Sequence, residues 1–191
     1  MNERIKTKAK NSTEGQVLVI FGANGDLSHR KLLPAIFHLF VDNLLPDKFA
    51  VIGAGSDEKT EETFRTEVRT QLAQFAPETV ADNPDKLTKF LELLYYKPVN
   101  NKIKEDFDGL KSYIDTLCTR LDIPRNLIYY FSIPPFMYEV VAAHLVSSGL
   151  NTEKDGWKRI IVEKPFGYSY DSAVELDGKL HDGFAEHQIY R

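Results

Sequence analysis

Short uncharged runs of apolar residues alternate along the chain with longer segments whose apolar residues recur every three or four positions. The first run, Gln16 to Phe21, is rich in β-branched residues, which is typical of a strand buried on both faces of a parallel sheet. Comparable runs predict five further strands, at Phe49 to Ile52, Leu93 to Tyr96, Leu127 to Ile133, Arg159 to Val162 and Gln188 to Tyr190.

The segments between these runs have the periodicity of amphipathic helices. It is cleanest at Phe107, Leu110, Ile114, Leu117 and Leu121, and it also covers Leu33 to Phe40, Phe64 to Phe75, Tyr138 to Ser148 and Ala173 to Leu180. Strands that alternate with helices favour right-handed βαβ units. The sequence therefore predicts an α/β fold with a doubly wound parallel sheet, of the Rossmann-like, dinucleotide-binding type.

The predicted domain organisation is one folded unit with a short leader. Residues 1–14 precede the first strand and include a basic run, so we expect a flexible N-terminal tail. Residues 15–191 are predicted to form a dinucleotide-binding domain that is incomplete at its C-terminal end. The polar stretch from Ala76 to Asp85, which contains Pro77 and Pro84, is expected to be an exposed connection.

Composition narrows the class of protein. A net charge of -4 without a basic patch argues against a nucleic-acid partner, and no apolar stretch approaches membrane-spanning length. The single cysteine, Cys118, excludes an internal disulfide and favours a reducing compartment, so we expect the cytoplasm. The five histidines lack the spacing of metal ligands, and we predict no metal site.

The turn after the first strand has the composition of a phosphate-binding loop. Gly22, Ala23, Asn24, Gly25, Asp26 and Leu27 lie between a strand and a helix, where glycines allow a phosphate close to the backbone and the helix N-terminus attracts its charge. The alternative is a tight turn in which Asp26 caps the helix. His29, Arg30 and Lys31 follow in the first turns, where the helix dipole disfavours cations and a bound anion would offset that cost.

Three other strand ends add candidate groups. Gly53 and Gly55 are expected to end the second strand, leaving Ser56 and Asp57 where such folds contact the adenosine ribose. An acid at that place favours NAD, whereas an arginine favours NADP; alternatively, Asp57 or Thr60 caps the next helix. Pro134 shapes the end of the fourth strand, and Lys164 follows the fifth, where its ammonium could hold a phosphate or a sugar hydroxyl.

Three motifs together resemble the glucose-6-phosphate dehydrogenase family. VIFGANGDLSHRKLLPAIFHLF at residues 19–40 is similar to its coenzyme signature, and RIIVEKPFGYSYDSAVEL at 159–176 to its Glu-Lys-Pro-Phe-Gly block. Residues 188–191 resemble the run that leads into its Arg-Ile-Asp-His-Tyr-Leu-Gly substrate motif. The resemblance implies an oxidoreductase of carbohydrate metabolism. Such an enzyme converts glucose 6-phosphate to 6-phosphogluconolactone, the first step of the oxidative pentose phosphate pathway.

The resemblance also assigns roles. It implies that residues 22–27 bind the coenzyme pyrophosphate, that Lys31 reaches the active-site crevice, and that Lys164 contacts substrate and nicotinamide beside a cis Pro165. The family's catalytic base is a histidine paired with an aspartate farther along, so no catalytic residue is expected within this chain, and the chain alone is expected to be inactive. A second, large α+β domain and a homodimer or homotetramer are implied for the complete protein.

One departure concerns the coenzyme. The family's NADP enzymes usually carry an arginine at the position of Ser56, so NADP is the expected coenzyme with NAD or dual use left open. A non-catalytic dinucleotide-binding module is the main alternative function. An enzyme acting on nucleotide sugars is disfavoured, because Tyr138 is not followed four residues later by a lysine.

Overall fold

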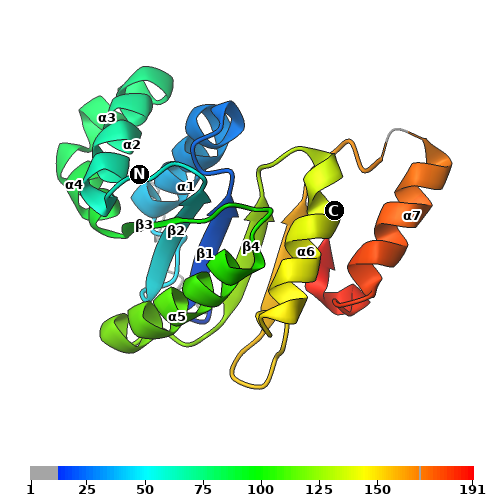
Figure 1. Ribbon diagram of the computed structural model, residues 1–191. Helices are drawn as coiled ribbons and strands as arrows, with labels where there is room; N and C mark the ends of the chain where they lie inside the picture. Colours follow the sequence, from blue (N-terminus) through cyan, green and yellow to red (C-terminus); the bar gives the residue numbers. More distant parts are fainter. Residues whose placement is uncertain (1–12, 168) are drawn as a thin grey trace, which may run out of the picture.

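The computed structural model describes residues 13–167 and 169–191, in which six strands form one parallel sheet (Figure 1). They are β1 Gln16–Phe21, β2 Phe49–Gly55, β3 Leu94–Pro98, β4 Leu127–Phe131, β5 Lys158–Val162 and β6 Ile189–Tyr190. Their order is β3-β2-β1-β4-β5-β6, and every neighbouring pair is parallel. The order reverses between β1 and β4, as in a doubly wound sheet, which confirms the predicted fold class.

Helices cover both faces of the sheet. They are α1 Leu33–Val41, α2 Glu61–Phe75, α3 Pro77–Asp82, α4 Pro84–Glu92, α5 Lys104–Leu121, α6 Tyr138–Ser147 and α7 Tyr170–His181. In Figure 1, α5 and α6 cross in front of the strands, and α1 to α4 gather at the upper left. Short turns of π-helix at Ser28–Leu32 and of 3-10 helix at Pro135–Met137 and Glu186–Gln188 complete the fold.

The alternation of side chains along β1 divides the interior into two cores. Val17, Val19 and Phe21 pack with apolar residues of α5, α6 and α7. Leu18 and Ile20 point to the opposite face and pack with residues of α1, α2 and α4. Both faces of β1 are therefore buried, which explains why its sequence is a continuous apolar run.

The segment from Ala76 to Asp85 is largely exposed, as expected, but it is helical and not a loop. The segment forms α3 and the start of α4, and Pro77 and Pro84 each stand in the first turn of a helix, where the missing N–H of proline costs nothing. Helix α4 was missed altogether. Its buried residues Leu87, Phe90 and Leu91 have helical spacing and join the core beneath α1 and α2.

Two predicted strand ends also need correction. Gly53 and Gly55 lie within β2 rather than after it, because packing requires glycine there: a Cβ on Gly53 would lie 2.7 Å from the Phe64 ring. The fourth strand ends at Phe131 and does not reach Ile133. Its neighbour β1 ends at Phe21, and the chain turns away at Gly22 with a φ of 80°, so β4 has no strand to pair with beyond that point.

The predicted tail falls almost entirely on residues 1–12, which lie outside the described residues. The described part begins three residues before Gln16, the first residue of β1. The proposed boundary between tail and domain at residue 14 stays a prediction.

A carboxylate near the start of β5 makes the stability of the domain depend on acid. Glu153 accepts hydrogen bonds from the Lys158 N–H (3.0 Å), from His187 Nε2 (2.7 Å) and from the Arg159 guanidinium. Burial opposes ionisation, but these hydrogen bonds outweigh it and lower the pKa of Glu153 from 4.5 to about 2. The carboxylate thus stabilises the fold fully above about pH 4.5, and this contribution disappears as the pH falls to about 2.

We therefore expect Glu153→Gln to lower stability at neutral pH and to flatten the decline of the unfolding midpoint between pH 4.5 and pH 2. Urea unfolding at a series of pH values measures both effects. Glu58→Gln removes an exposed carboxylate and should leave the pH profile unchanged. A Glu153→Gln profile parallel to that of the parent would contradict the assignment.

Candidate functional site

The turn between β1 and the first helix lies where the sheet order reverses. Gly22 has a φ of 80°, and a Cβ there would lie 2.2 Å from the Ser132 carbonyl oxygen at the end of β4. Ser28 Oγ donates to the Gly22 carbonyl and meets Ser132 Oγ, both at 3.0 Å. The glycine thus lets the ends of β1 and β4 approach, and Ser28, which is fully buried, holds them together.

The helix that follows begins at Asp26, and its first i→i−4 bond runs from the His29 N–H to the Gly25 carbonyl (3.1 Å). The amides of residues 26–28 therefore lack intrahelical acceptors, as at any helix N-terminus. A Cβ on Gly25 would lie 3.1 Å from the Gly22 carbonyl, so the loop is narrow at this point. The result is a short glycine-lined turn with donor groups at a helix end, the arrangement that binds phosphate.

The helix then widens into a π turn at Ser28–Leu32. The Leu33 N–H bonds the Ser28 carbonyl, five residues back, and the buried Pro34 follows. Proline has no N–H and cannot make the i→i−4 bond in a helix interior, which accounts for the wider turn.

The three basic residues at the start of this helix, His29, Arg30 and Lys31, are not three free charges waiting for an anion, as the sequence suggested. Burial lowers the pKa of the half-buried His29 and so favours its neutral form. Arg30 pairs with Asp26 at 3.3 Å and lies over the Phe75 ring. Asp26 is itself the first residue of the helix, and its carboxylate forms an ion pair with Arg30. The alternative role of Asp26 as the helix cap is therefore not needed to explain its presence. Lys31 is exposed, and no hydrogen bond or ion pair of its side chain occurs within the described ranges.

The glycine turn is joined to the end of β2 by a polar network. Asn24 Nδ2 donates to Asp57 Oδ2 (2.8 Å) and to Tyr96 Oη (2.9 Å), and the Tyr96 hydroxyl donates to the Asp57 carbonyl (3.0 Å). A Cβ on Gly55 would lie 2.7 Å from Asn24 Nδ2, so only glycine leaves room for this contact. Burial raises the pKa of Tyr96, which keeps its hydroxyl as a donor. Asp57 is thereby held beside the candidate phosphate loop.

The alternatives at this edge are resolved. Thr60 caps α2, because its Oγ1 accepts from the Thr63 N–H at 3.1 Å, and Asp57 is free for the contact with Asn24. Ser56 is exposed beside Asp57. Arg65 of α2, the next arginine after Asp57 in the chain, donates to the carbonyl of Leu94, the first residue of β3. It therefore lies at the opposite edge of the sheet.

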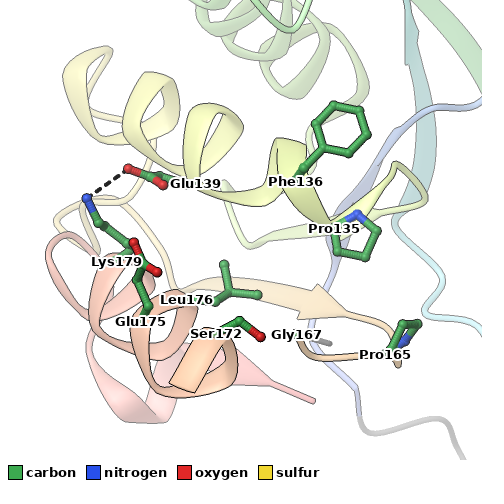
Figure 2. Close-up of a pocket in the computed structure, with 9 residues that line it drawn as sticks. All are labelled: Pro135, Phe136, Glu139, Pro165, Gly167, Ser172, Glu175, Leu176 and Lys179. Carbon is green, nitrogen blue, oxygen red and sulfur yellow. Dashed lines mark ion pairs between the residues drawn. The ribbon is translucent and has the colours of Figure 1, made fainter. Parts of the chain in front are cut away.

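A second concave region lies at the same carboxyl edge, between the starts of α6 and α7. It is a pocket of about 510 Å³, lined by Pro135, Phe136, Glu139, Pro165, Gly167, Ser172, Glu175, Leu176 and Lys179. Figure 2 shows the ion pair of Glu139 and Lys179 (3.0 Å) at one end and the two prolines at the other. The Lys164–Pro165 bond is cis, which confirms the expectation from the resemblance.

The remaining candidates flank this pocket. Lys164 is exposed just after β5, without a hydrogen bond or ion pair in the part of the chain described here. Its neighbour Glu163 accepts a hydrogen bond from the Tyr130 hydroxyl. Pro134 directly precedes the pocket residue Pro135. The structure thus joins residues 22–27 to Asp57, whereas no hydrogen bond links Lys31 or Lys164 to that network within the described residues.

Sequence reasoning missed several members of the site. Tyr96 was predicted only as the end of a strand; it is buried, and its hydroxyl belongs to the Asn24 network. Ser28 and Ser132 were not singled out, because their contact joins residues 104 positions apart and has no local signal in the sequence. Lys59 was not singled out either, and its Nζ lies 3.7 Å from Asp57 Oδ2.

Within the described residues, no cluster of three or more histidine, cysteine or acidic side chains is arranged to hold a metal ion. No helix in the described ranges is both long and apolar enough to cross a membrane.

The sheet order and the glycine turn at its reversal define a dinucleotide-binding domain of the Rossmann type. A family model described as glucose-6-phosphate dehydrogenase, NAD binding domain, matches residues 19–191. The chain belongs to this family.

Similar proteins and solved structures agree with this family assignment. The chain is 40% identical over 93% of its length to the glucose-6-phosphate 1-dehydrogenase of Aggregatibacter actinomycetemcomitans, and 36% over 97% to that of Treponema pallidum. A structure of glucose-6-phosphate dehydrogenase in complex with glucose 6-phosphate superimposes with a TM-score of 0.83 at 31% identity, over 93% of this chain and 36% of the other. The Mycobacterium avium enzyme gives 0.77 at 25% identity, over 92% and 35%. The chain spans about 35% of the length of the relatives it matches.

Proposed function

We propose that this chain is the coenzyme-binding part of a glucose-6-phosphate 1-dehydrogenase, which oxidises glucose 6-phosphate to 6-phosphogluconolactone. The observation that carries the proposal is the family match over residues 19–191, supported by a relative solved with glucose 6-phosphate. We further propose that the complete protein is a cytoplasmic homodimer or homotetramer acting in the oxidative pentose phosphate pathway.

The residues present fit a dinucleotide. A side chain at Gly22 would collide with the backbone of Ser132, and one at Gly25 would crowd the backbone of Gly22. The first backbone amides of the helix lie beside this turn without intrahelical acceptors. In this proposal the amides of residues 22–27 bind the pyrophosphate, and the carboxylate of Asp57 accepts from a ribose hydroxyl with Ser56 next to it. Asn24 orients Asp57, since both of its amide protons are used within the network.

At the pocket end, Pro134 limits the space beside the nicotinamide, and Lys164 binds the substrate and the nicotinamide portion of the coenzyme. Lys31, on the helix after the phosphate loop, binds substrate. The bound nicotinamide supplies the hydride acceptor. A base must remove the C1 hydroxyl proton as hydride leaves C1, and no residue of this chain is assigned that role.

For the coenzyme, the family resemblance supports NADP and the position of Asp57 supports NAD, because an acid at the ribose repels a 2′-phosphate. We therefore propose that the complete protein uses both dinucleotides. This differs from a strict NADP enzyme, in which an arginine would replace Ser56.

The test is turnover of the complete protein with glucose 6-phosphate, followed by the absorbance of the reduced nicotinamide. We expect activity with NADP and with NAD, and none from a protein of these 191 residues alone. Dinucleotide binding by the complete protein without turnover on any sugar phosphate would instead support a non-catalytic module.

A further inference from the structure

A lysine and a glutamate beside Asp57 form a small charged cluster that the proposed function leaves unused. Lys59 Nζ contacts Glu67 Oε2 of α2 at 2.6 Å and lies 3.7 Å from Asp57 Oδ2. The Lys59 side chain is only 10% exposed and lies over the Tyr96 ring, 5.5 Å from its centroid. Lys59 is thus held in place by Glu67 and Tyr96, with Asp57 as its weaker partner.

The charges of this cluster sum to one negative charge, from two carboxylates and one ammonium. The shorter ion pair uses the lysine to neutralise Glu67 on helix α2 and leaves the exposed Asp57 largely uncompensated. Burial lowers the pKa of the nearby His29, which favours its neutral form. A neutral ribose hydroxyl is compatible with such an edge, whereas a 2′-phosphate with nearly two negative charges is repelled.

We propose that Glu67, a positioning residue that does not touch the coenzyme, sets the balance between NAD and NADP by holding Lys59 away from the 2′ position of the adenosine ribose. This inference rests on the proposed coenzyme site. It assigns to helix α2 a specificity function, carried by a residue twelve positions after Gly55, the last residue of β2.

Removing the Glu67 charge reverses the arrangement. Lys59 then has Asp57 as its remaining acidic partner, the cluster becomes neutral, and the ammonium is available to a phosphate at the ribose. Charge-assisted contacts to phosphate are the stronger class of hydrogen bond, so the gain falls on NADP and leaves NAD nearly unchanged.

The experiment titrates the complete protein with NAD and with NADP and compares the two dissociation constants in each variant. We expect Glu67→Gln to improve the binding of NADP relative to NAD by about tenfold, a change of ~1.4 kcal/mol. Glu67→Asp keeps the charge and should restore the parent ratio. The double variant Glu67→Gln with Lys59→Gln should lose the gain, because the phosphate partner is gone. Glu62→Gln, an exposed carboxylate on the same helix, should leave the ratio unchanged.

The outcomes separate the two proposals. An unchanged ratio in Glu67→Gln, with both coenzymes still bound, overturns this inference and leaves the proposed function intact. A gain that survives the loss of Lys59 also overturns it, since the effect would then be one of net charge alone. A parent that binds NADP a hundredfold more tightly than NAD refutes the electrostatic premise. A parent that binds neither dinucleotide overturns the proposed function together with the inference. Retained NAD affinity in each variant shows that the site is folded.

Discussion

Gly22→Ala is expected to destabilise the domain by about 3 kcal/mol or more and to abolish dinucleotide binding. The left-handed backbone at this position, with a φ of 80°, is itself unfavourable for alanine. The larger cost is steric, because the new Cβ would lie 2.2 Å from the carbonyl oxygen of Ser132. That oxygen belongs to the backbone at the end of β4 and cannot rotate away. Relief requires β1 and β4 to separate at the sheet's reversal point, which also displaces the phosphate loop.

Urea unfolding of the 191-residue chain measures the loss of stability, and coenzyme titration of the complete protein measures the loss of binding. Gly178→Ala is the matched control, because a Cβ at that position in helix α7 would meet no described atom within 4 Å apart from its chain neighbours and the backbone of its own helix. It should stabilise the chain by about 0.5–1 kcal/mol, as expected for alanine in a helix interior. A Gly22→Ala protein with parental stability and affinity would show that the close approach to Ser132 is not required.

The strand and helix pattern was readable from the sequence because periodicity reports burial directly. The continuous apolar run of β1 and the three- and four-residue spacing in α5 both follow from the faces they bury. Glycine and proline were less reliable as signals of where a strand or helix ends. Gly53 is an interior residue of β2, and it is glycine because the Phe64 ring leaves no room for a side chain. Pro84 stands at the start of a helix and not in a loop. Such facts depend on neighbours that are distant in sequence.

The candidate site likewise has a part that local sequence predicts and a part that depends on distant neighbours. The glycine turn could be found locally, since strand, glycines and helix are consecutive. The network of Asn24, Asp57 and Tyr96 could not, because it joins residues 33 and 72 positions apart through the order of three strands. The opposite error occurred with Arg30: its charge was read as a need for an anion, but Asp26, one turn earlier on the same helix, meets that need.

Lys164→Gln in the complete protein is expected to lower kcat/KM for glucose 6-phosphate by about a hundredfold. The ammonium stands exposed after β5, without a partner among the described residues, while Tyr130 holds the adjacent Glu163 carboxylate. An unpaired cation beside a pocket is free to bind an anionic substrate, and a hydrogen bond to a charged group contributes about 1.5–3 kcal/mol. That range corresponds to roughly 10- to 150-fold in rate. Glutamine keeps a polar hydrogen-bond donor on a slightly shorter side chain and carries no charge, so the loss reports chiefly the charge.

The measurement is steady-state kinetics with both substrates varied, combined with coenzyme titration. Lys154→Gln removes the same charge from an exposed lysine in the loop that precedes β5, at the opposite edge of the sheet, and should leave kcat/KM unchanged. If Lys164 binds substrate, its loss affects glucose 6-phosphate more than it affects the dissociation constant of the coenzyme, because the phosphate loop at residues 22–27 is intact. A Lys164→Gln enzyme with the kinetics of Lys154→Gln would remove Lys164 from the site. Within this proposal, the binding of the sugar phosphate would then fall to Lys31 and to groups outside these 191 residues.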